Sequence, residues 1–174
     1  IEFSDYECPF CKRHFDQVYP DLKKNYIDTG KLKMVFRDLP LSFHDPLATK
    51  EAIAANCAKE QGGDEAYYKM HDALFTKTTS NGNGLTIDNL YTMASEVGLN
   101  AANFKTCLDS DKYKDEVAKE KEMVERIARS KNTGVSDAIV AGYEAILKKN
   151  QDNQKTIIDN EEKKLEGLKE RDPS

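Results

Sequence analysis

The chain opens with Ile1-Glu2-Phe3-Ser4-Asp5-Tyr6-Glu7-Cys8-Pro9-Phe10-Cys11, the most informative stretch of the sequence. Its apolar beginning predicts a short strand, its middle a turn, and its end a C-x-x-C pair that opens a helix. Pro9 suits the first helical position, because an N–H at that position would have no helical partner. The order strand, turn, helix therefore places Cys8 at the amino end of a helix.

The position of Cys8 predicts a reactive thiol. Free backbone N–H groups and the positive end of the helix dipole stabilise an anion at a helix N-terminus. The thiolate is the form of cysteine that attacks and leaves in disulfide exchange. Cys11 follows one helical turn later, close enough to form a disulfide with Cys8. The pair is therefore predicted to be a redox dithiol.

Half of a zinc site is the alternative interpretation of a C-x-x-C pair. Zinc prefers a second pair of ligands at similar spacing. The other cysteines, Cys57 and Cys107, lie in separate segments, and His14 is the nearest further candidate. We expect His14 to be a surface residue and predict no metal site, because four ligands are hard to assemble from these residues.

Four further motifs follow the C-x-x-C stretch in a characteristic order. Together with E-F-S-D-Y-E-C-P-F-C at 2–11, they are M-V-F-R-D-L-P-L at 34–41, A-A-N-C-A-K-E-Q-G at 54–62, M-H-D-A-L-F at 70–75 and F-K-T-C-L-D-S at 104–110. On these motifs residues 1–119 resemble the DsbA-like thiol-disulfide oxidoreductases of the thioredoxin superfamily. The first motif is catalytic and highly specific. The other four are framework patterns, and mainly their order along the chain supports the resemblance.

The resemblance implies a role for each residue of the first motif. Cys8 would be the nucleophile, Cys11 the resolving thiol, and Pro9 and Phe10 the dipeptide that sets the redox poise. Glu2 lies six positions before Cys8, where thioredoxin-like proteins keep a buried acid that can relay a proton to or from the resolving thiol. The alternative for Glu2 is a solvated charge at the end of a strand.

The composition sets limits on the class of protein. The 174 residues carry a formal net charge of −5 with both signs mixed, so nothing indicates nucleic-acid binding. No apolar run approaches the length of a membrane span. The even number of cysteines suits an oxidising compartment. We expect an extracytoplasmic protein, on the periplasmic or cell-envelope side, whose signal or anchor sequence lies outside this chain.

Residues 1–45 predict a βαβ unit that contains the dithiol. A helix is expected from Pro9 to about Thr29, kinked at Pro20 and stopped by Gly30. Its predicted buried stripe comprises Cys11, Phe15, Val18, Tyr19, Leu22 and Tyr26. A buried strand is expected from Leu32 to Phe36. His44 falls in the following loop, where it could line the rim of the active site, although exposure is the default.

Residues 46–119 predict an inserted all-helical subdomain. One helix is expected to stop at Gly62-Gly63, with Asp64, Thr86 and Asn100 as caps of later helices. His71 follows an apolar stripe, which indicates a core histidine. Cys57 and Cys107 would lie on two of these helices beside apolar neighbours, and we predict a structural disulfide between them; two reduced buried thiols are the alternative.

Residues 120–174 depart from the family pattern. DsbA-like proteins have a Gly-Thr-Pro-like loop with a cis-proline and then a β-hairpin, but here no proline occurs between Pro46 and Pro173. Asp137-Ala138-Ile139 follows Thr133-Gly134-Val135-Ser136, and a non-proline cis bond is not expected there. A helix through Ile139 to Leu147 and a charged segment from 151 to 171 are predicted instead. Substrate binding along that loop would lack its usual residue.

The expected fold class is therefore α/β, an incomplete thioredoxin-like fold with an inserted all-helical subdomain and a helical C-terminal extension. The expected function is a thiol-disulfide oxidoreductase that uses Cys8 and Cys11, needs no cofactor, and acts on reduced or misfolded polypeptides. A membrane or soluble redox partner would reset the dithiol. The alternatives are a redox-inert helical binding or scaffold protein, or a reductase or isomerase of the same fold.

Overall fold

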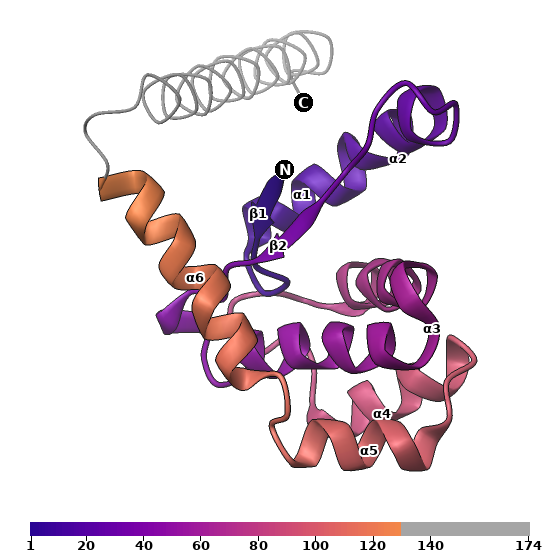
Figure 1. Ribbon diagram of the computed structural model, residues 1–174, viewed down its shortest axis with the longest axis vertical. Helices are drawn as coiled ribbons and strands as arrows, with labels where there is room; N and C mark the ends of the chain where they lie inside the picture. The colour runs from indigo at the N-terminus through magenta and orange to yellow at the C-terminus, as the bar shows by residue number, and fades with distance from the viewer. Residues whose placement is uncertain (130–174) are drawn as a thin grey trace, which may run out of the picture. The chain divides into compact units, whose positions relative to one another are not determined.

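The computed structural model describes residues 1–129, of which Ile1–Glu125 form one compact unit. The described chain alternates short strands and helices before it becomes all-helical (Figure 1). In order, the elements are β1 Glu2–Ser4, α1 Pro9–Gln17, α2 Tyr19–Leu22, the π-helical turn η1 Lys23–Ile27, β2 Phe36–Asp38, the 3-10 turn η2 Ser42–His44, α3 Leu47–Lys77, α4 Ile87–Glu96, α5 Ala101–Asp109 and α6 Lys114–Arg129.

The two strands pair in parallel, as a βαβ unit requires. Glu2 lies opposite Phe36, and Ser4 lies opposite Asp38. The predicted strand at 32–36 was therefore placed several residues too early. The apolar run that suggested it ends where the ladder begins, because the partner hydrogen bonds, not the apolar run, define the strand.

Side chains form hydrogen bonds with the edge of β2 that does not pair with β1. The Phe36 N–H donates to the Tyr68 hydroxyl at 3.3 Å, and the Asp38 N–H donates to Glu120 Oε2 at 2.7 Å. Glu120 also accepts a hydrogen bond from Arg37 at 2.5 Å. Backbone groups that would otherwise lack partners are thus satisfied from α3 and α6.

The first helical segment is broken where the sequence predicted a kink. Val18, with φ −117° and ψ −45°, separates α1 from α2 two residues before Pro20. Tyr19 is buried, and Cys11 and Phe15 pack against the core. Val18 and Tyr26 are 48% and 51% exposed, so their assignment to a buried stripe was wrong. The break rotates the second half of the segment out of the helical register that the stripe assumed.

The breaks and N-caps of the helices after η2 lie largely where the sequence predicts them. α3 is interrupted at Gly62 and Gly63, and the latter has φ +64°, a left-handed conformation that favours glycine. Thr86 and Asn100 cap α4 and α5 through side-chain bonds to the third backbone N–H. Asp64 instead pairs with Lys59. Figure 1 shows α4 and α5 against α3, with β1, β2 and α1 on its other side.

A cluster of aromatic rings surrounds His71 in the core. The imidazole is 1% exposed, and its Nδ1 lies 2.8 Å from Asp72 Oδ1. Six rings lie within 6 Å of it, centroid to centroid: Tyr6, Phe15, Tyr19, Phe36, Tyr68 and Phe75. His71 is a satisfied core histidine, as predicted, and it joins α1 and the sheet to α3.

Two groups of expectations remain predictions. The loop at 133–136, the helix through Ile139 to Leu147 and the charged segment 151–171 lie outside the described residues. The domain limits at residues 45 and 119 are not tested; the second falls within α6. None of the helices in residues 1–129 combines the length and the apolar character needed to cross a membrane.

Candidate active site

Cys8 is the N-cap of α1, with Pro9 in the first helical turn. Its backbone is extended, at φ −80° and ψ 120°, and its carbonyl accepts the first helical bond from the Lys12 N–H at 2.9 Å. The turn before it packs inward, with Ser4, Asp5 and Glu7 all buried. The thiol therefore lies at the helix N-terminus, where a negative charge is favoured.

The two free thiols differ sharply in acidity. The pKa of Cys8 is lowered to about 6, chiefly by a hydrogen bond with the Cys11 thiol and further by the backbone of Cys11 and Phe10. Burial and the charge of Asp5 oppose this shift. The pKa of Cys11 is raised by its bond to Cys8 and by burial. Cys8 is thus ionised at neutral pH, and Cys11 remains a thiol that supports it.

The dipeptide between the cysteines is mainly exposed. Phe10 is 61% exposed, and the Arg13 guanidinium carbon lies 5.2 Å from the centre of its ring. Lys12 is engaged elsewhere, since its Nζ donates to the Phe75 carbonyl at 2.7 Å and pairs with Asp16. Neither cation is among the causes that lower the Cys8 pKa.

Glu2 is not the buried acid that the resemblance implied. Its side chain is 24% exposed, and its Oε1 lies 3.6 Å from Nδ1 of His14 on α1. His14 is itself 39% exposed, in keeping with a surface residue. Glu2 starts β1 near the protein surface, so the pair is partly solvated. Its part in proton transfer is untested.

The buried acids near the dithiol come from positions that sequence reasoning passed over. Glu7 and Glu51 have no exposed surface, and Asp5 is 3% exposed. Burial, followed by the charge of Glu7, raises the pKa of Glu51 to about 10, so this carboxyl is neutral at physiological pH. Neither of its oxygens has a hydrogen-bond partner within the described part of the chain. The available signal was a glutamate, next to Lys50, at the alanine-rich start of α3.

His44 was predicted to be exposed and is buried. Its side chain is 5% exposed, and its Nδ1 lies 2.8 Å from Oδ2 of Asp5, whose side chain is 2% exposed. The adjacent residue, Phe43, is 74% exposed. Because η2 turns inward after Leu41, the chain directs the imidazole under the active-site turn and leaves the phenyl ring outside.

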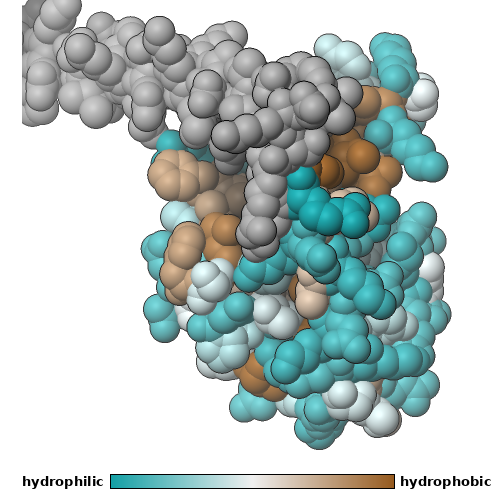
Figure 2. Space-filling view, turned by 60° about the vertical axis from the view of Figure 1, so that its left-hand side comes forward, coloured by the Kyte–Doolittle hydropathy of each residue, from teal (hydrophilic) through white to brown (hydrophobic). Residues whose placement is uncertain are grey.

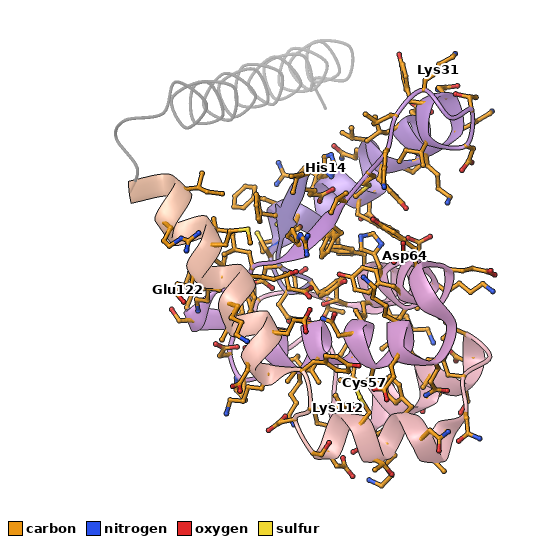
Figure 3. All side chains as sticks on the ribbon, in the orientation of Figure 1. His14, Lys31, Cys57, Asp64, Lys112 and Glu122 are labelled. Atoms are coloured by element: carbon orange, nitrogen blue, oxygen red, sulfur yellow. A yellow bond between two sulfur atoms is a disulfide. The ribbon has the colours of Figure 1, made fainter. Side chains whose placement is uncertain are left out.

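The predicted disulfide between Cys57 and Cys107 is present. It joins α3 to α5, with a Cα–Cα distance of 5.9 Å (Figure 3). Among residues 1–129, no three His, Cys, Asp or Glu side chains are placed to share a metal ion. Cys8 and Cys11 are consequently the two cysteines of the described chain available for exchange.

A family model described as thioredoxin matches residues 1–160. The chain belongs to the thioredoxin family. Within that family it is DsbA-like. It is 30% identical to DsbA2 of Pseudomonas aeruginosa over 75% of this chain and 65% of that one, with a TM-score of 0.56. BdbD of Bacillus subtilis is 25% identical over 72% of this chain and 67% of that one, with a TM-score of 0.62.

The similarity to one relative extends over nearly the whole of this thioredoxin-family chain. A Bacillus cereus protein described as a probable disulfide bond formation protein D is 28% identical over 94% of this chain and 74% of that protein. Other curated relatives are much longer. The chain spans 38–40% of four Rickettsia proteins and 10% of Na⁺/H⁺ antiporter NhaA 3 of Salinispora tropica. The thioredoxin-like α/β fold with a helical insertion is confirmed.

Proposed function

We propose that this chain is a thiol-disulfide oxidoreductase that introduces or exchanges disulfides in polypeptides through Cys8 and Cys11. The observation that carries the proposal is the position of Cys8 as the N-cap of α1 beside the free Cys11 thiol. In keeping with this position, the pKa of Cys8 is lowered to about 6 and that of Cys11 is raised. A cysteine with this difference in acidity from its partner is a good leaving group and a ready nucleophile.

The reaction begins with the Cys8–Cys11 disulfide. A substrate thiolate attacks the Cys8 sulfur, a mixed disulfide forms, and the electron pair of the broken bond leaves on Cys11, which takes up a proton. A second substrate thiolate then attacks the substrate sulfur of the mixed disulfide and releases the Cys8 thiolate. The substrate loses two electrons and gains a disulfide, and the dithiol gains those electrons. The stability of the released thiolate favours this direction.

Each turnover needs an oxidant to restore the Cys8–Cys11 disulfide. We propose a redox partner, membrane-bound or soluble, that accepts the two electrons of the dithiol. An extracytoplasmic location fits this requirement and the Cys57–Cys107 bridge, since structural disulfides persist in oxidising compartments. The antiporter and disulfide-formation relatives are themselves bacterial proteins.

Two exposed phenylalanine side chains, one of them between the cysteines of the dithiol, support a polypeptide substrate. Phe10 lies between the two cysteines, and Phe43 precedes the histidine that contacts the active-site turn. Figure 2 shows hydrophobic residues gathered in separate areas of a surface that is mostly hydrophilic. Unfolded polypeptides expose apolar groups that such side chains can contact.

Oxidation of a reduced two-cysteine peptide by the disulfide form of the full chain tests the proposal. We expect stoichiometric loss of peptide thiols with the disulfide form of the unchanged chain, and no reaction with Cys8→Ala. Reduced Cys11→Ala, mixed with the same peptide in its disulfide form, should trap a mixed disulfide at Cys8, because the Cys8 thiolate attacks the peptide disulfide, releases one peptide thiolate and then lacks a second thiol to resolve the bond. Insulin reduction and the equilibrium with glutathione give the preferred direction. A folded chain whose Cys8 alkylates with the pH midpoint of an ordinary thiol, and which oxidises no peptide, would be a redox-inert binding protein instead.

A further inference from the structure

Asp5 holds both halves of the dithiol through its backbone. Its carbonyl accepts a hydrogen bond from the Cys8 N–H at 3.1 Å, across the turn that presents the thiol. A backbone hydrogen bond from Asp5 also reaches the Cys11 sulfur and counts among the interactions that lower the pKa of Cys11. The geometry of the two sulfurs therefore depends on the position of this one residue.

Three donors converge on the Asp5 side chain from two separate segments. Oδ1 accepts from the Glu7 N–H at 2.8 Å. Oδ2 accepts from the Leu41 N–H at 2.8 Å and lies 2.8 Å from His44 Nδ1. Hydrogen bonds to a charged carboxylate are stronger than those between neutral groups. Both side chains of the Asp5–His44 pair are also buried, which strengthens the interaction further.

The loop after α3 packs against the backbone of His44. A Cβ on Gly82, which has φ +74°, would lie 3.1 Å from the His44 Cα, so this loop passes directly over the histidine backbone. The charged or titratable groups around the pair are Glu7 on the same turn, Glu51 on α3 and the two cysteines of α1. Within the pair itself, the negative charge of Asp5 raises the pKa of Cys8 and so acts against the thiolate.

We propose that the Asp5–His44 pair is a positioning element of the dithiol that also sets its redox potential. Asp5 fixes the turn that presents Cys8, and its negative charge makes the thiolate less stable than the helix terminus alone would make it. His44 holds that carboxylate in place and offsets part of its charge. The inference rests on the proposed function, because it concerns the same two thiols.

Electrostatics predicts opposite effects for the two partners. Removal of the Asp5 charge stabilises the Cys8 thiolate, which stabilises the reduced form and makes the disulfide a stronger oxidant. Removal of His44 leaves the carboxylate with one donor fewer and its charge less offset, which destabilises the thiolate. A purely structural loss of packing would have no reason to shift the two variants in opposite directions.

The test measures the rate of Cys8 alkylation by iodoacetamide against pH in the full chain, together with the equilibrium with glutathione. Asp5→Asn is expected to lower the alkylation midpoint by about 0.5–1 pH unit, with a roughly three- to tenfold shift of the equilibrium towards the reduced form. His44→Leu is expected to raise the midpoint by about 0.5 unit. Asp21→Asn, an exposed change of the same charge on α2, should leave both readouts unchanged.

A double variant shows whether the two residues act as a unit. With Asp5→Asn already present, His44→Leu should have little further effect on the midpoint, because the charge that it offsets is gone. The inference would be overturned if the midpoint shifts of the two single variants added fully in the double variant, or if the two single variants shifted the midpoint in the same direction. Should Asp5→Asn fail to fold, an unchanged midpoint in folded His44→Leu would overturn it alone. An ordinary thiol midpoint in the unchanged chain would instead reject the proposed function.

Discussion

The Thr78 hydroxyl donates a hydrogen bond of 2.5 Å to Oε1 of Glu7, a residue 71 positions earlier in the chain. The same carboxylate accepts from the Gly84 N–H at 2.9 Å, and the Glu7 carbonyl accepts from the Asn81 N–H at 2.7 Å. Residue 7 thus ties the loop after α3 to the turn that presents Cys8. The rigidity of the active-site turn is supplied from the inserted helices.

Replacement of Gly84 by alanine should destabilise this junction. A Cβ at Gly84 would lie 1.9 Å from Thr78 Oγ1 and 2.4 Å from Glu7 Oε1, so the hydrogen bonds must break or the loop must shift. We expect the free energy of unfolding to fall by about 1–3 kcal/mol, as for other overpacked sites. Urea denaturation measures the loss.

Gly30→Ala is a comparison that has backbone strain but no steric overlap. Gly30 has φ +73° but nothing within 4 Å of the added Cβ, so that variant reports the backbone strain alone. Strain of this kind costs about 1 kcal/mol. Gly84 has no left-handed φ, so an unchanged free energy of unfolding in Gly84→Ala would show that the groups around the Glu7 carboxylate tolerate a side chain there.

Glu51 should make the chain less stable as the pH rises. Its pKa is about 10 in the folded chain, against 4.5 for an ordinary glutamate, so the folded state binds more protons between those values. Stability from this group is complete below about pH 4.5 and is lost as the pH approaches 10. Relative to the unchanged chain, Glu51→Gln should gain in urea midpoint steadily between about pH 5 and pH 9.

Asp38 provides a comparison with a different pH window. Burial, followed by the charge of Glu120, raises its pKa to about 7 from 3.8, so its contribution is lost by neutral pH. The advantage of Asp38→Asn should therefore grow between about pH 4 and 7 and stay level above 7. A Glu51→Gln advantage that also stopped growing near pH 7 would contradict the assignment of a neutral carboxyl to Glu51.

Local signals in the sequence were sufficient for several parts of the site and fold. The placement of Cys8 at a helix start, the break at Gly62-Gly63 and the caps at Thr86 and Asn100 each depend on a few neighbouring residues. The burial of His71 followed from the spacing of its apolar neighbours. Such features can be predicted because local backbone geometry selects the residue types.

Contacts between distant segments could not be predicted in the same way. Asp5 and His44 are 39 positions apart, and Glu7 and Thr78 are 71 apart, so no periodicity links them. An isolated loop histidine has no local feature that separates an exposed side chain from one drawn under a turn. The position of β2 was missed for a related reason, because the pairing with β1 defined it.

Loss of the Cys57–Cys107 disulfide should weaken the fold and leave the dithiol unchanged. The bond closes a loop with a sequence separation of 50, which corresponds to about 3–4 kcal/mol if the loss of chain entropy in the unfolded state is the main effect. Chemical denaturation of Cys57→Ala/Cys107→Ala measures this loss. The alkylation midpoint of Cys8 serves as the control, since the bridge links α3 to α5, away from α1. A shifted midpoint would mean that the helical insertion controls the thiol directly.

Phe10→His should make the Cys8–Cys11 disulfide a stronger oxidant. Phe10 contributes its backbone to the low Cys8 pKa, but its phenyl ring can offer neither a charge nor a hydrogen bond to the thiolate. An imidazole at the same exposed position can donate to the thiolate or carry a positive charge, which lowers the thiol pKa by about 1 unit and shifts the glutathione equilibrium about tenfold towards the reduced form. Phe10→Leu keeps an apolar side chain and separates this effect from the loss of the contact with Arg13. If redox titration finds the unchanged chain more oxidising than Phe10→His, the dipeptide does not set the potential through the stability of the Cys8 thiolate.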